Sequence, residues 1–572
     1  MLTGRKQPDM RFDYLRIVGL ALLFFVPFLG AVHLFDWNEV HVAECTREML
    51  VTGNFFCPQL NFQLYWETPP LFLWFQAISM KIFGIGEFAA RFPNAICGLV
   101  TMLVVYRIGY RLHDRGFGWL WVLAWLGSLL PHLYFRSGIV DPWYNLLIFI
   151  SLYSFIEFRW LFFTRFEGRN FWHRYRYLIL GGGVLGLAVL TKGPIAYLII
   201  LLTLLAYFAR YGFRNKGFMK HLAYYTAAAV AVSLVWYGVE MALHGSSFVQ
   251  AFLTHQFQLF FADDEGGSGF FGFHVLVLLL GCFPISAFAL ANLWGDHQSQ
   301  DEMLESDPLA SCKRSDMATW MQFLFWVVLV VFSLMRTKMA HLSSLAYFPL
   351  TYLGTLTIWR ALRWKVQPRI VGYVLPALGI LIGVAGMALP LIGQNIQWLK
   401  PLVAGNSFAE ARLAIEMDWY WWQGLPGFAL VLTTIVAWRY WQRNKAWRAA
   451  QTIFTGGAIF VAFTLVFIIG NIEKYTQYST IEFYESKAGE NCSIQPVGFK
   501  SYAHLFYSQM CPSKLKQSIG SDSILVHTPA GKKIYFVAKL SDVKHLSGLS
   551  NCKELFRKDG LVYYEKVLDA GK

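Results

Sequence analysis

Long apolar runs constrain the fold of this chain more than any other feature. A helix of about 20 apolar residues crosses the roughly 30 Å hydrocarbon core of a bilayer. The sequence holds about thirteen such runs by that measure, near residues 16–35, 91–110, 117–135, 142–163, 177–192, 194–209, 222–243, 269–292, 319–336, 342–361, 370–393, 420–440 and 450–470. We therefore expect an α-helical polytopic membrane protein.

The positive charge of the chain follows the same pattern. The formal net charge is +14, but only 15% of the residues are charged and 56% are hydrophobic. The Lys and Arg residues lie between the apolar runs, as in the cytoplasmic loops of membrane proteins, and do not form a nucleic-acid-binding face. Basic residues before the first run place the N terminus in the cytoplasm: Arg5, Lys6, Arg11 and Arg16.

Two segments on the outer face have structure of their own. In the first outer loop, 36–90, "EVHVAECTREML" and the stretch after "PP" favour helices that lie along the membrane surface. The tail 471–572 alternates strand-like runs such as "SILVHTP", "KKIYFVAK" and "GLVYYEKV" with turns, which predicts a small α/β domain beyond a transmembrane domain of residues 1–470.

Cysteines on the outer face leave two possibilities open. Cys45 and Cys57, and likewise Cys492 and Cys511, could pair in an oxidising compartment. Free buried thiols are as consistent with the sequence, because cysteine is often buried without a partner.

Ionisable residues close to membrane depth are costly and therefore either find partners or serve function. Each alone is more often a solvated charge or an ion pair, but the predicted topology gathers several at the outer end of the bundle. They include Glu39, Glu67, Arg136, Asp141, Lys192, Lys338 and His341.

Several motifs together resemble the aminoarabinose-transferase and protein-mannosyltransferase group of integral membrane glycosyltransferases. They are "DWNEVHVAECTREML", "YWETPPLFLWFQAISMKIFGIGEFAARFPNA", "SGIVDPWYN", "LTKGP" and "GCFPIS". The resemblance implies the C-type glycosyltransferase fold with a C-terminal extracytoplasmic domain. It also implies inverting transfer of a sugar from a polyprenyl-phosphate donor to a lipid or protein acceptor, at the periplasmic face of a bacterial inner membrane.

The motifs agree with the family only in part. Glu67, Asp141 and Lys192 match family positions, whereas Asn38 stands where the family has an aspartate and Thr68 where it has a lysine that meets the carrier phosphate. A further family arginine falls on a position that is occupied here by Gln258 or Leu259. His255 matches a histidine that, with the glutamate at Glu67, binds a divalent metal in some members.

These departures leave two main readings. In an active enzyme, Glu39 and Asp141 orient or deprotonate the acceptor while Asn38 holds it; a phosphate acceptor needs no base, because it is already ionised. Lys192, Lys338, Arg136 or a divalent ion then replaces the missing lysine at the carrier phosphate. Tyr65 stacks on the sugar or lines the lipid groove, although anchoring at the membrane interface explains it equally well. In the alternative, the chain is a catalytically silent subunit or scaffold of an envelope membrane complex. A transporter would show paired broken helices, and we find none in the sequence.

Overall fold

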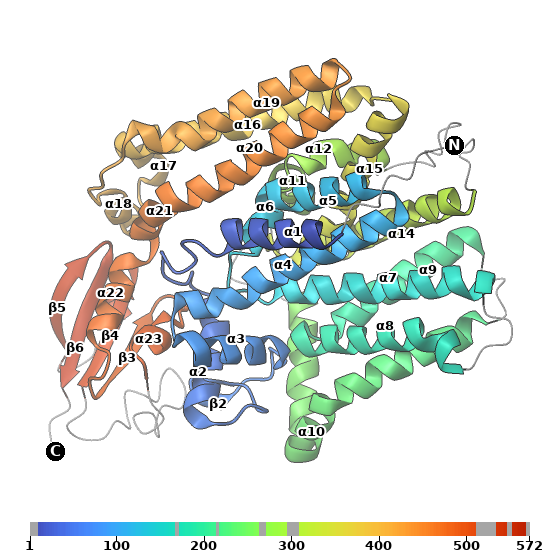
Figure 1. Cartoon of the computed structure of the whole chain (residues 1–572). Helices are drawn as coiled ribbons and strands as arrows, with labels where there is room; N and C mark the ends of the chain where they lie inside the picture. Colours follow the sequence, from blue (N-terminus) through green and yellow to red (C-terminus); the bar gives the residue numbers. More distant parts are fainter. Residues whose placement is uncertain are drawn as a thin grey trace.

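The computed structural model describes residues 10–165, 171–212, 217–261, 270–293, 308–510, 533–545 and 552–567. A large helical bundle makes up most of the molecule, and a small sheet lies at one end of it, beside the first outer loop (Figure 1). The bundle consists of α1 (Met10–Phe25), α4 (Glu87–Leu112), α5 (Arg115–Gly127), α6 (Leu129–Tyr134), α7 (Asp141–Arg165), α8 (Phe171–Lys192), α9 (Ile195–Tyr211), α10 (Phe218–Phe261), α11 (Phe273–Gly281), α12 (Ile285–Ala289), α14 (Pro308–Leu334), α15 (Tyr347–Trp364), α16 (Arg369–Gln394), α19 (Leu425–Gln442) and α20 (Ala446–Phe467).

The helical, membrane-spanning character expected from the sequence is confirmed. Among the described residues, five helices are long and apolar enough to cross a bilayer, and a sixth if α11 and α12 count as one span. The number of thirteen spans therefore stays a prediction.

Two of the expected spans have a different shape. The run 269–292 is not one straight helix: α11 and α12 meet at an angle of 109° next to the cis peptide bond between Phe283 and Pro284. The run 222–243 belongs to the longer helix α10, which bends at Gly245 (φ 59°) and continues to Phe261. Part of the segment expected to be an outer loop, 244–268, is therefore helical.

The first outer loop forms two helices where the sequence predicts them; their position along a membrane surface stays a prediction. α2 (Val40–Thr52) ends at Gly53, whose φ of 72° suits glycine, and α3 (Leu71–Phe83) starts directly after the proline pair. Between them, β1 (Gln59–Leu60) and β2 (Gln63–Leu64) form a tight hairpin. This hairpin was not predicted, because two-residue strands leave no periodic pattern.

The C-terminal segment forms a four-stranded sheet with the order β3-β4-β6-β5. β3 (Cys492–Val497) runs parallel to β4 (Lys533–Lys539), whereas β6 (Leu561–Val567) is antiparallel to both β4 and β5 (Cys552–Lys558). The runs "KKIYFVAK" and "GLVYYEKV" are thus strands, as predicted; "SILVHTP" lies outside the described residues. Further elements of this outer end are α17 (Lys400–Val403), α18 (Ser407–Leu413), α21 (Ile469–Thr476), α22 (Tyr478–Ser486) and α23 (Ala503–Tyr507).

The C-terminal sheet domain packs directly on the first outer loop. Val40, Ala43 and Met80 share an apolar core with residues of the domain such as Tyr484 and Tyr507. The Tyr507 hydroxyl also accepts a hydrogen bond from the backbone N–H of Leu34, at 2.7 Å. The loop and the tail domain therefore form one rigid cap at the end of the bundle where α1 terminates.

Candidate active site

An ion pair between Asp141 and Lys192 lies at the centre of the candidate site. Asp141 begins α7, and Lys192 ends the neighbouring helix α8. The Lys192 Nζ donates to Asp141 Oδ1 at 2.7 Å, and the carboxylate is almost fully buried. A carboxylate at a helix N terminus and an ammonium at a helix C terminus both complement the helix dipole, so the two helix ends stabilise the pair.

Glu67 belongs to the first outer loop, between β2 and α3, and is exposed. The Tyr65 hydroxyl donates to Glu67 Oε2 at 2.6 Å. Burial lowers the pKa of His41, on α2, and both Glu67 and Lys192 act on it, the first raising the pKa and the second lowering it. Glu67 and Lys192 therefore both lie within electrostatic range of this histidine.

His341 approaches the pair from the turn between α14 and α15. Burial lowers the pKa of this imidazole to about 4, although the nearby Asp141 carboxylate opposes the shift. His341 is therefore neutral at pH 7 and can offer a hydrogen bond to a ligand without adding charge.

The surroundings of Glu39 are not those expected of a catalytic base. It is buried at 4% exposure and forms two hydrogen bonds with the Arg91 guanidinium, at 2.6 and 3.0 Å. Backbone N–H groups of Phe35 and Gly138 also donate to its carboxylate, at 2.9 and 2.5 Å. Burial would raise the pKa of Glu39, but Arg91 and these hydrogen bonds hold it below its ordinary value. Such a carboxylate is a poor proton acceptor and joins the loop to α4 and to the turn before α7.

The two positions that depart from the family motif differ in exposure. Asn38 is exposed, and within the described part of the chain its amide makes no hydrogen bond. Thr68 is buried, at 9% exposure, beside the proline pair that starts α3. Asn38 can therefore contact a ligand directly, whereas Thr68 cannot supply the charge of the lysine that the family has there.

Arg136 and Lys338 hold helix ends. The Arg136 guanidinium donates to the backbone carbonyls of Phe24 and Pro27 at the end of α1, at 3.1 and 2.6 Å. The Lys338 ammonium donates to the carbonyls of Ser333 and Met335 at the end of α14, at 2.7 and 2.6 Å. Both charges thus satisfy carbonyls that a helix end leaves open, which is a structural role; the expected phosphate contact of either residue stays a prediction.

The expected metal pair and the expected arginine position are only partly described. Glu67 is exposed and hydrogen-bonded as above, whereas the side chains of His255 and Leu259 lie outside the described residues. Gln258 is exposed on the outer part of α10.

Two residues of the site were missed in the sequence. Arg91 sits inside an apolar run of α4, where a charged residue is costly enough to require a partner, so its position was a usable signal. His41 lies in "EVHVAEC" on α2 without a motif of its own. Only the tertiary structure brings it within electrostatic range of both Glu67 and Lys192.

The fold is that of membrane-embedded glycosyltransferases of the C-type. The family described as dolichyl-phosphate-mannose-protein mannosyltransferase matches residues 67–237. The chain is 25% identical over 430 residues to an undecaprenyl phosphate-alpha-4-amino-4-deoxy-L-arabinose arabinosyl transferase of Proteus mirabilis, covering 72% of this chain and 70% of that one. An enzyme of the same name from Photorhabdus laumondii is 26% identical over about half of each chain (50% and 51%).

A solved structure extends the likeness to the whole fold. ArnT from Cupriavidus metallidurans, bound to undecaprenyl phosphate, superposes with a TM-score of 0.72 over 99% of this chain and 100% of that one, at 17% identity. Because it covers the C-terminal sheet as well as the bundle, the complete architecture is shared. The family match, the sequence relatives and the shared fold all point to the aminoarabinose-transferase and protein-mannosyltransferase group of integral membrane glycosyltransferases, which this chain resembles.

Proposed function

We propose that this protein transfers a sugar from a polyprenyl-phosphate carrier to a lipid or protein acceptor at the outer end of the bundle. The observation that carries the proposal is the Asp141–Lys192 pair, at 2.7 Å. His341 lies within electrostatic range of both members of the pair, and His41 lies within range of Lys192 and Glu67. The undecaprenyl phosphate bound to the structurally similar protein from Cupriavidus metallidurans supports a donor of this class.

The Lys192 ammonium is our candidate for the cation at the carrier phosphate. Bond breaking between the anomeric carbon and the phosphate oxygen leaves additional negative charge on the phosphate, which a preorganised cation stabilises. An ammonium has three donors, so Lys192 can contact a phosphate while one donor stays on Asp141. Lys192 would thus take the place of the lysine that is missing at Thr68, and neither Arg136 nor Lys338 would have to contact the phosphate.

Asp141 is our candidate for the group that orients the acceptor. Lys192 binds its Oδ1, so Oδ2 is the oxygen that can take a proton from an acceptor hydroxyl as that hydroxyl attacks the anomeric carbon with inversion. A phosphate acceptor would attack without this proton transfer. Glu39, held by Arg91, supports the loop, and Asn38 can hydrogen-bond the acceptor without removing a proton.

The activity is tested with purified protein, a radiolabelled polyprenyl-phosphate sugar and candidate acceptors. Wild type should transfer or release the sugar, and Lys192→Met should lower kcat/KM at least about 100-fold, the cost of losing one preorganised charge contact. Lys474→Met, on the exposed surface of α21, is the matched control and should stay active. Equal turnover of both variants would refute the role of Lys192, and no turnover by wild type would favour a silent subunit.

We also propose a multi-pass location in a bacterial inner membrane, with a cytoplasmic N terminus and the C-terminal domain in the periplasm. The basic residues before α1 support this orientation. A reporter enzyme that is active only outside the cytoplasm, fused after Lys572, should be active; activity only when it is fused before Met1 would reverse the orientation.

A further inference from the structure

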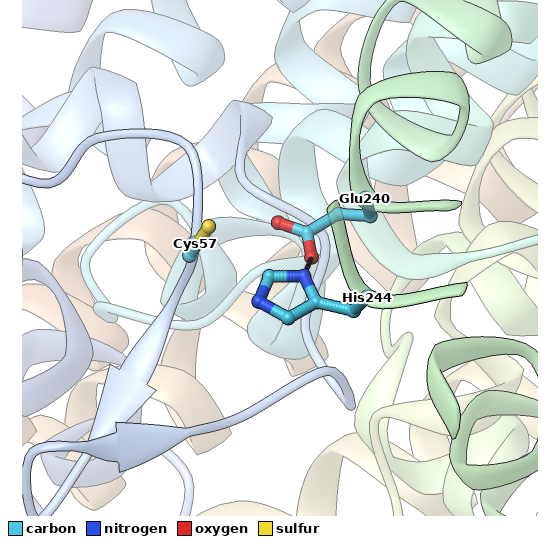
Figure 2. Close-up of side chains that lie close together, drawn as sticks. All are labelled: Cys57, Glu240 and His244. Carbon is cyan, nitrogen blue, oxygen red and sulfur yellow. Dashed lines mark ion pairs between the residues drawn. The ribbon is translucent and has the colours of Figure 1, made fainter. Parts of the chain in front are cut away.

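The first outer loop meets α10 at three side chains that commonly bind metals. Cys57 precedes the β1–β2 hairpin, and Glu240 and His244 lie on α10; one ligand atom from each lies within 4.8 Å of the others. Figure 2 shows one carboxylate oxygen of Glu240 turned toward the His244 ring and the other toward Cys57. We propose that these residues bind a divalent cation of the zinc type, which fastens the first outer loop to α10.

The helix positions two of the three ligands for a common centre. Glu240 and His244 are separated by one helical turn, so their side chains lie on the same face of α10. The His244 Nδ1 is 2.9 Å from Glu240 Oε2. The bend at Gly245 follows directly, so the pair sits where the straight part of α10 ends and the loop passes over it.

Burial of the Glu240 carboxylate favours a cation at this place. The residue has 0% exposure, and within the described part of the chain no lysine or arginine pairs with it. Its Oε2 accepts a hydrogen bond from the Trp66 indole at 3.1 Å, whereas its Oε1 has no hydrogen-bond donor among the described residues. A buried carboxylate with an unsatisfied oxygen is costly, and a bound cation would satisfy it.

The donor set selects the metal class. A thiolate, an imidazole and a carboxylate together suit zinc, which takes four ligands and accepts water at a position the protein leaves open. Bonds of about 2.0–2.3 Å to a tetrahedral ion set its ligand atoms about 3.3–3.8 Å apart. A contraction of about 1 Å would therefore close the observed cluster around an ion.

The surrounding contacts are those of a supported metal site. Trp66 donates to Glu240 and packs edge-on against His244 at 5.5 Å between ring centroids, while Trp236 of α10 donates to the backbone carbonyl of Phe56 at 2.8 Å. Outer contacts of this kind orient metal ligands. The same hairpin carries Tyr65 and Glu67 at its other end, so the ion would also fix the segment that reaches the active site.

Metal binding can be measured without any transferase activity. Full-length protein in detergent is stripped with a chelator, loaded with Zn²⁺ or Co²⁺ and freed of excess metal; metal content and the cobalt absorption spectrum are then recorded. We expect one ion per chain and a sulfur-to-cobalt charge-transfer band. Cys57→Ser should abolish the band, and Glu240→Gln and His244→Gln should each weaken zinc binding at least about tenfold, the smallest cost expected for losing a ligand.

Matched variants separate this site from others. Cys312→Ser removes an exposed thiol elsewhere and should change neither metal content nor spectrum. Cys57→His replaces one ligand by another and should retain zinc but lose the sulfur band, which guards against a Cys57→Ser variant that fails to fold. Wild type without stoichiometric metal would overturn the proposal. A metal at another place would do so too: the ion would then be lost in Glu67→Gln and His255→Gln but kept in the Cys57, Glu240 and His244 variants. Neither result bears on sugar transfer.

Discussion

At the scale of single residues, partners decide what a carboxylate can do. Glu39 and Asp141 are both buried acids at the outer end of the bundle. The Glu39 carboxylate accepts hydrogen bonds from Nε and Nη2 of Arg91 and from two backbone N–H groups. The described partner of Asp141 is a single ammonium, that of Lys192. These partners support our proposal that Asp141 orients the acceptor, whereas Glu39 holds the loop in place.

Restoring the family charges tests whether they limit catalysis. If Lys192 replaces the missing lysine only in part, the double variant Asn38→Asp, Thr68→Lys should raise turnover about tenfold or more. Each preorganised charge contributes several kcal/mol in such sites. Initial rates with a labelled donor measure the effect. Asn38→Gln, which adds no charge, is the control; unchanged turnover of the double variant would mean that Lys192 already supplies the needed charge or that the acceptor needs no base.

At the scale of secondary structure, small residues allow the helices of the bundle to approach closely. α5 and α20 touch through glycines: a Cβ on Gly127 would lie 2.2 Å from the carbonyl oxygen of Phe454, and one on Gly457 would lie 2.0 Å from that of Gly127. Close approach at small residues is a general means of packing membrane helices. α20 in turn leads into α21 and the C-terminal domain, so this contact helps to set the position of the cap.

Substitution of these glycines should destabilise the bundle. We expect Gly127→Ala to lower the free energy of unfolding by about 1–3 kcal/mol, since the backbones must separate to admit a methyl group. Gly19→Ala is the matched control, because Gly19 lies on an exposed part of α1 with no atom near its added Cβ. Thermal unfolding in detergent measures both; equal midpoints would contradict the close contact of α5 and α20.

At the scale of the whole molecule, the tail domain is attached to the bundle by polar contacts as well as by its apolar core. His33, after α1, contacts Glu473 of α21 through its backbone N–H at 3.1 Å and its ring Nδ1 at 2.5 Å. Burial alone would lower the pKa of His33, but the hydrogen bond and charge of Glu473 outweigh burial and raise the pKa above the usual 6.5. The protonated histidine therefore stabilises the docked cap.

This ion pair predicts a pH dependence of docking. A histidine whose pKa is raised on folding contributes its full stabilisation below the unfolded value of about 6.5 and loses it as the pH rises through the higher folded value. Proteolytic release of the tail should accordingly become faster as the pH is raised above about 6.5. In Glu473→Gln, release of the tail should be fast at every pH and should no longer depend on pH, after correction for the protease's own pH profile. An unchanged pH dependence in this variant would assign the effect to another group.

The sequence by itself determined those features that depend on local pattern. Hydropathy marked a polytopic helical bundle, the proline pair marked the start of α3, and alternation marked β4 and β6. The family resemblance also came from contiguous motifs. The sequence did not predict the bend between α11 and α12 or the continuation of α10 beyond Gly245. An apolar run has the same pattern whether its helix is straight or broken.

Only the tertiary structure decided which charges meet. Asp141 pairs with Lys192 because the start of α7 packs beside the end of α8, and Glu39 is occupied because α4 presents Arg91 to the loop. The same packing leaves Cys45 and Cys57 as separate thiols; Cys511 lies outside the described residues. Ion pairs and metal ligands depend on distances of a few ångströms between segments far apart in the chain, and local sequence patterns carry no record of those distances.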